Sequence, residues 1–140
     1  GRSSSFAIDL FDLALVSAQS EDPDQRFQCP GSILRAIPVE GSRWTGGLPD
    51  STSIFFSRSL AWREKEQEED SPTVKSLLKF PHQQILLSGW AQNEEVMAGA
   101  TVWATYSPGE GRVHLFGFRP HYRSWSHGTF DLLLRAILLP

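Results

Sequence analysis

Short β-rich runs, separated by turns that contain proline and glycine, make up most of this chain. Only two segments, one near each end, have the apolar spacing of a helix. A half-buried strand must pack its apolar face against another layer, so strands bracketed by helices predict an α/β layered domain. At 140 residues the chain is long enough for one domain, 1–140, and too short for two. The predicted strands are 32–39, 53–57, 74–80, 85–90, 100–106 and 112–118.

The clearest strand pair lies on either side of the turn at 107–111, which contains Pro108 and Gly109. The runs 100–106 and 112–118 are both β-rich, so this spacing predicts a C-terminal hairpin. Apolar residues occupy both faces of the second run. We therefore expect that run to lie centrally in the sheet and to be covered on both sides.

A helix is predicted over about 4–16, because serines precede an apolar-periodic segment there. A second, closing helix is predicted after Ser126, which is a plausible N-cap residue. Its apolar residues recur at i, i+3, i+4, i+7 and i+8, and this stripe is expected to pack against the sheet. The stripe consists of Phe130, Leu133, Leu134, Ile137 and Leu138.

Composition and charge argue against several classes of protein. Thirteen Lys and Arg against sixteen Asp and Glu give a net charge of −3, which argues against a nucleic-acid binder with a basic face. No apolar run approaches the ~20 residues of a membrane helix, so no membrane partner is expected. No signal peptide is visible at the start of the sequence. The acidic run within 63–72 is interpreted as a solvated loop.

Histidines and the single cysteine are the first candidates for chemistry. His114, His121 and His127 could converge on zinc, but their spacing fits no strong zinc motif. Cys29 could be a nucleophile, but a strand-like run follows it where a reactive thiolate usually meets a helix N-terminus. Packing explains these residues better. We therefore predict no catalytic residue and no metal ligand in this chain.

A binding surface is predicted where the last strand meets the last helix. Arg119, Arg123, Ser126 and His127 lie there in sequence, and a helix N-terminus offers backbone donors to an anion. The alternative is a capped loop whose arginines pair with acidic residues. Both interpretations remain open at this point.

Five segments of the chain are informative together: 29–35 (CPGSILR), 55–59 (FFSRS), 86–90 (LLSGW), 109–120 (GEGRVHLFGFRP) and 127–130 (HGTF). In this order they resemble the C-terminal region of large bacterial zinc carboxypeptidases of the carboxypeptidase A family. In those proteins a class I glutamine amidotransferase-like domain, flavodoxin-like in fold, follows the peptidase domain. The resemblance implies that this chain is the later part of such a domain, with a mixed sheet, the hairpin and the closing helix.

The resemblance implies no active site in this chain, because the catalytic motifs of the two families are missing. The peptidase family holds zinc with an H-x-x-E pair, and no histidine of this chain has glutamate three residues later. Active amidotransferases end a late strand with His-Pro-Glu, where this chain has Arg119, Pro120 and His121. Arginine, with a pKa above ~12, cannot accept the thiol proton.

The expected role is therefore a non-catalytic accessory domain of a zinc metallocarboxypeptidase-like protein, whose proteolysis and zinc belong to an upstream domain of the same chain. That upstream peptidase domain is the expected partner, and the resemblance implies a bacterial secreted or periplasmic parent. The alternative is a stand-alone, degenerate amidotransferase-like domain that binds a small metabolite or carbohydrate. A third possibility, a hydrolase built on the three histidines, requires bound metal.

Overall fold

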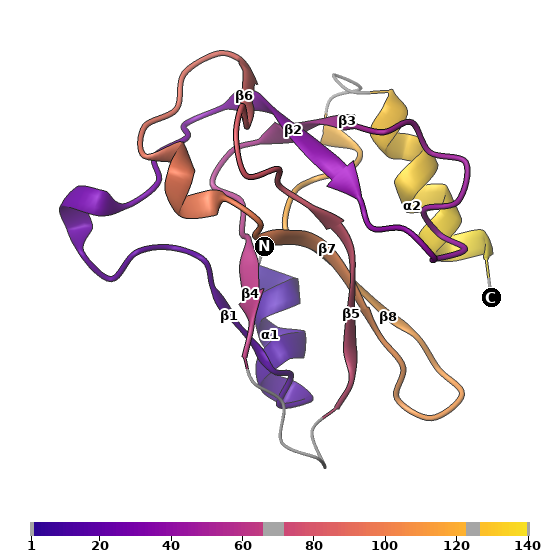
Figure 1. Ribbon diagram of the computed structural model, residues 1–140. Coiled ribbons are helices and arrows are strands. Elements are labelled where there is room, and N and C mark those ends of the chain that lie inside the picture. The colour runs from indigo at the N-terminus through magenta and orange to yellow at the C-terminus, as the bar shows by residue number, and fades with distance from the viewer. Residues whose placement is uncertain (1, 66–71, 123–126, 140) are drawn as a thin grey trace.

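The computed structural model describes residues 2–65, 72–122 and 127–139. In these residues an eight-stranded sheet is accompanied by a helix at each end of the chain (Figure 1). The elements are α1 (Arg2–Leu10), β1 (Leu15–Ser17), the 3₁₀ turn η1 (Pro23–Gln25), β2 (Ser32–Pro38), β3 (Thr52–Phe56), β4 (Trp62–Glu64), β5 (Val74–Lys79), β6 (Leu86–Ser88), the 3₁₀ turn η2 (Glu94–Met97), β7 (Thr101–Tyr106), β8 (Val113–Phe116) and α2 (Gly128–Leu138).

The sheet has the order β1-β4-β7-β5-β2-β3, with β6 paired to β2 and β8 paired to β7. Each pairing that the described strands make is antiparallel, so the expected mixed sheet is corrected to an antiparallel one for these residues. A tight turn imposes this direction only on β7 and β8, because two adjacent strands joined by such a turn must run in opposite directions. The other pairs are antiparallel across longer connections. The α/β composition, the hairpin and the closing helix agree with the sequence prediction.

The predicted C-terminal hairpin is confirmed, with Trp103 opposite Phe116 and Tyr106 opposite Val113. The expected central position of its second strand is wrong. β8 pairs only with β7 among the described strands, whereas β7 pairs with β4, β5 and β8. The first five residues of β7 are all buried, so the central strand is the first of the pair.

The first helix is shorter than predicted, because α1 ends at Leu10 and Asp12 has a positive φ of 47°. This left-handed residue turns the chain, so that Leu13 enters the core. Phe6 and Leu10, which were expected on the buried face, are exposed. The predicted acidic loop also needs correction, because Arg63 and Glu64 belong to β4 and pair with β1. Residues 66–71 of that run lie outside the described residues.

The second helix buries a different face from the predicted one. Thr129 and Leu132 are completely buried, and Ala136 packs against the main core. Of the predicted stripe, Leu134 and Ile137 are exposed, as is Leu138. The hydroxyl of Thr129 donates a hydrogen bond to the carbonyl of Pro120, which fixes the rotation of the helix about its axis.

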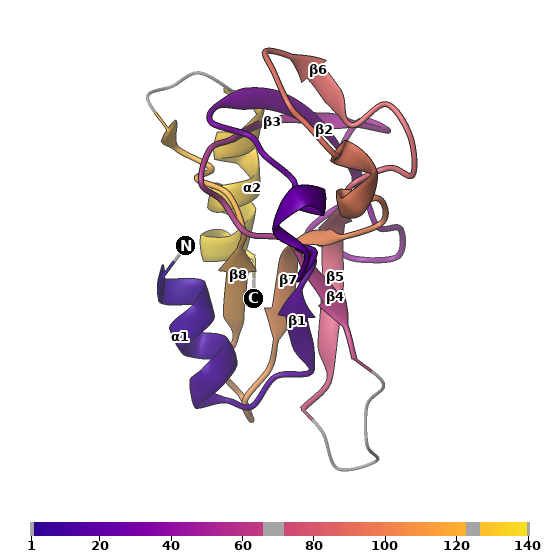
Figure 2. The same ribbon diagram turned by 90° about the vertical axis from the view of Figure 1, so that its left-hand side faces the viewer.

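Two clusters of buried side chains form the core. The larger contains Trp103, Leu34 and Phe80, and α2 packs against it through Leu132. The smaller gathers Trp62, Leu115 and their neighbours beneath α1. Figure 2 shows α1 beside β8, and α2 makes its contacts with β3 at another part of the sheet. Neither helix in the described part of the chain has the length and apolar character required to cross a bilayer.

Candidate functional site

The predicted surface between the last strand and α2 is only partly described. Arg123 and Ser126, including the predicted N-cap, lie outside the described residues. The guanidinium of Arg119 lies 5.5 Å from the ring of Tyr122. His127 precedes α2, makes no capping hydrogen bond through its side chain and stacks on Phe130. The structure therefore gives these two residues aromatic neighbours and leaves the convergence of all four untested.

The histidines do not gather in the described structure. Within residues 2–65, 72–122 and 127–139, no three His, Cys, Asp or Glu side chains lie close enough together to hold a metal ion. The Nδ1 atom of His114 instead accepts a hydrogen bond of 3.3 Å from the indole Nε1–H of Trp103. Burial, followed by the charge of Arg112, lowers the pKa of His114 to about 4. The imidazole is therefore neutral at pH 7, with its proton on Nε2.

Cys29 is held in the structure as a hydrogen-bond donor. Its Sγ donates to the carbonyl oxygen of Phe56 at 3.1 Å. Burial raises the pKa of the thiol above its ordinary value, and the opposing effect of neighbouring donors is smaller. A nucleophilic cysteine needs the opposite shift, because the thiolate is the reactive form.

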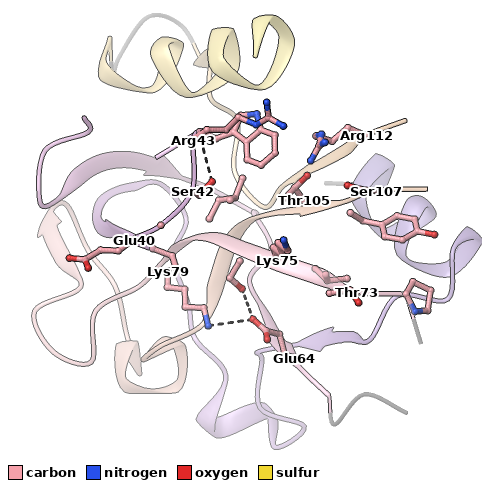
Figure 3. Close-up of a pocket in the computed structure, with 18 residues that line it drawn as sticks. Glu40, Ser42, Arg43, Glu64, Thr73, Lys75, Lys79, Thr105, Ser107 and Arg112 are labelled. Atoms are coloured by element: carbon pink, nitrogen blue, oxygen red, sulfur yellow. Dashed lines mark hydrogen bonds and ion pairs between the residues drawn. The ribbon is translucent and has the colours of Figure 1, made fainter. Parts of the chain in front are cut away.

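A large groove lies over β5 and the end of β7, bordered by the loop that follows β2 (Figure 3). Its volume is about 1290 Å³, which is ample for a small ligand. Basic and acidic side chains both line it, with the basic ones in excess. The basic residues are Arg43, Lys75, Lys79 and Arg112, and the acidic ones are Glu40 and Glu64.

The β4 end of the groove is closed by a network of hydrogen bonds. The hydroxyl of Ser76 donates to Glu64 at 2.5 Å, and Lys79 Nζ lies 3.4 Å from the same carboxylate oxygen. Because Ser76 has one proton to donate, the hydroxyl of Thr101, 2.6 Å away, donates to Ser76. The ion pair is more than a third exposed, so it contributes little stability. This end of the groove is satisfied internally.

The opposite end of the groove is built on Trp44. The guanidinium Cζ atoms of Arg43 and Arg112 lie 4.9 Å and 4.5 Å from the Trp44 ring centroid. His114 packs edge-to-face on the same indole at 5.4 Å. Trp44 is 6% exposed, so the two cations cover an otherwise buried aromatic ring.

The loop that carries Trp44 is held in place from both sides. Thr45 donates its hydroxyl proton to the carbonyl of Val39 at 2.7 Å, which closes the loop at its base. The guanidinium of Arg135, on α2, donates to the carbonyls of Trp44 and Gly46 at 3.4 Å and 2.7 Å. The position of Trp44 is therefore fixed by a helix far away in the sequence.

Neither Trp44 nor this groove was among the sites predicted from the sequence. Arg43 and Trp44 are adjacent in the sequence, but Arg112 lies in another turn, and nothing local connects the two segments. The only sequence signal is that each arginine lies next to turn residues at the edge of a β-rich run. That signal is too common to identify a site.

The chain was compared with protein-family models, with curated proteins and with solved structures, and none of the three comparisons finds a match.

Proposed function

We propose that this chain is a non-catalytic accessory domain of a zinc metallocarboxypeptidase-like protein, in which it packs against the upstream peptidase domain. Two lines of support are independent of each other. The first is the resemblance of five collinear segments to the C-terminal region of such proteins. The second, which carries the packing against a partner, is the outward apolar face of α2.

That face consists of Leu134, Ile137 and Leu138, which are 51%, 68% and 71% exposed. Positions i, i+3 and i+4 lie side by side on a helix, so the three side chains form one patch. Large aliphatic side chains grouped on one surface favour an interface, because burying each contributes about 1.5–3 kcal/mol. The opposite face of α2 already packs on this domain, so the patch is available to a partner.

The proposal of a non-catalytic domain rests on the residues that would have to act as base, acid, nucleophile or zinc ligand. Arg119 and His121 stand where active amidotransferases have a base and an acid. The thiol of Cys29 is bound to a backbone carbonyl, and burial keeps its pKa high. Proteolysis and zinc binding would belong to the parent protein, because the histidines of this chain lack the H-x-x-E partner.

The first test is the coding sequence upstream in the same reading frame, which should encode an H-x-x-E-bearing peptidase region. The second uses the full protein and compares Ile137→Asp with Leu87→Asp, an exposed leucine on β6. We expect faster hydrogen exchange across α2 in I137D only, because the charge opens the interface. An upstream region without H-x-x-E, or equal exchange in both variants, would contradict the proposal.

A second candidate is a stand-alone, degenerate amidotransferase-like domain that binds a small metabolite or carbohydrate. The groove of about 1290 Å³ favours this function, because small ligands bind in concave sites that offer placed polar or charged groups. A short reading frame without a peptidase region would support it over the first. Both candidates include a flavodoxin-like fold for the parent domain. In such a domain the parallel strands would precede, in the sequence, the antiparallel strands seen here.

A further inference from the structure

Two positive charges meet on one buried aromatic ring at the α2 end of the groove. Arg43 and Arg112 are both exposed, and Figure 3 shows their guanidinium groups at the same end of the pocket. Within the three described segments, neither of them forms an ion pair. Like charges repel, so this arrangement favours an anion between them.

The ring beneath these cations carries a hydrogen-bond donor without an acceptor. The Nε1–H of Trp44 is buried and has no partner among the described residues. His114, packed on the same ring, cannot supply one, because its Nδ1 already accepts from Trp103 and its Nε2 carries the proton. His114 Nε2 is itself buried without a partner. Both donors need an acceptor, and a buried donor left unpaired is costly.

The acidic groups of the groove do not neutralise this end. Glu64 is engaged by Ser76 and Lys79, and the side chain of Glu40 points away from Arg43 in Figure 3. The charge of Arg112 also contributes to the low pKa of His114. Among the described residues that line the groove, this end therefore carries the basic side chains without an acidic one beside them.

We propose that Arg43, Trp44 and Arg112 form a binding site for an oxyanion, namely a carboxylate or phosphate group of a small ligand. A guanidinium presents paired N–H donors that match the oxygens of such groups. The two side chains are exposed and make no ion pair, so they can rotate to admit the anion to the indole N–H. The site is separate from the apolar face of α2, and it does not depend on the accessory function proposed above.

The test is a titration of the whole protein, labelled with ¹⁵N in tryptophan, with sodium phosphate and with sodium acetate at constant ionic strength. Loss of one indole signal in Trp44→Phe, which keeps an aromatic ring and removes the N–H, assigns the Trp44 resonance. That resonance should shift and saturate, and the tighter-binding salt identifies the preferred oxyanion. Arg112→Gln and Arg43→Gln should each weaken binding about tenfold or more, because each removes a charged donor.

The matched control is Arg58→Gln, which makes the same charge change at an exposed residue outside the groove and should bind like the wild type. Wild-type affinity in both R112Q and R43Q would overturn the proposal. An equal response to sodium chloride would also overturn it, because it would show screening rather than a site. Loss of binding in R119Q alone would place the anion at the strand end instead.

Discussion

Replacement of Gly117 by alanine should destabilise the chain more than any surface change, because two backbone segments cross at this residue. The N–H of Gly117 donates to the carbonyl of Val102 at 2.8 Å, and its own carbonyl accepts from the N–H of Leu60 at 2.7 Å. A Cβ at position 117 would lie 2.0 Å from the Leu60 carbonyl oxygen and 3.0 Å from its carbon. Backbone atoms cannot rotate away from it as a side chain could.

The magnitude follows from the displacement that alanine requires. Carbon and oxygen need more than 3 Å between them, so the two backbones must separate by over an ångström and both hydrogen bonds are strained. Each such bond contributes about 1 kcal/mol, and overpacking costs about 1–3 kcal/mol more. We expect a loss of about 3–5 kcal/mol, a large fraction of the 5–15 kcal/mol typical of a domain. The corresponding fall in Tm is about 10 °C or more.

Thermal and urea unfolding followed by circular dichroism measures this loss. The matched control is Gly128→Ala, because a Cβ at that position meets no atom of the described residues within 4 Å and alanine favours the first turn of α2. G128A should unfold at or slightly above the wild-type temperature. If G117A unfolded at the same temperature as G128A, the close crossing of Gly117 and Leu60 would be refuted.

Three further predictions concern the core and the titratable groups. Leu132→Ala should cost about 2–5 kcal/mol in urea unfolding, because Leu132 is fully buried, whereas Leu134→Ala on the exposed face should change stability by less than about 0.5 kcal/mol. The pKa of His114 lies near 4 in the folded chain, below its ordinary 6.5, so the unfolded chain binds more protons between these values. Tm should therefore fall as pH decreases from about 6.5 towards 4, and His114→Gln should reduce that fall; an unchanged pH profile in H114Q would contradict the assignment. Because burial raises the pKa of Cys29, its thiol should react slowly with a disulfide reagent at pH 7 and rapidly in urea, and equal rates would show that the thiol is not held.

The strands were predictable because their signals are local. The predicted run 32–39 became β2 and the run 74–80 became β5, each within a residue or two at its ends. Proline and glycine turns bound these runs, and such turns act within a few residues. The direction of pairing is less local, and the resemblance misled the prediction towards a mixed sheet where the described strands pair antiparallel.

The helices were harder to predict because apolar spacing says nothing about which face has a partner. α2 carries apolar residues on more than one face, so a stripe through Leu134 and Ile137 was as regular as the face that is buried. The rotation of α2 about its axis is set by two hydrogen bonds. The hydroxyl of Thr129 donates to the carbonyl of Pro120, and the guanidinium of Arg135 donates to the carbonyl of Trp44. Those contacts join segments that are far apart in the sequence, so the spacing of apolar residues cannot predict them.

The groove could not be predicted for the same reason. It arises where the loop of Arg43 and Trp44 meets the turn of Arg112, and neither segment carries a recognisable motif alone. The sequence did identify Arg119 and His127 as candidates, because they lie beside a helix start. Their role is still a prediction, since Arg123 and Ser126 are not described.

Strand β2 has a consequence for how the whole molecule melts. Its residues pair with β3 and β6 on one part of the sheet, and Ile37 and Pro38 pair with β5 on the other. Neither part can separate without breaking the ladder of a strand that both share. Although the buried side chains form two clusters, heating should therefore produce a single cooperative transition, with calorimetric and van't Hoff enthalpies in agreement.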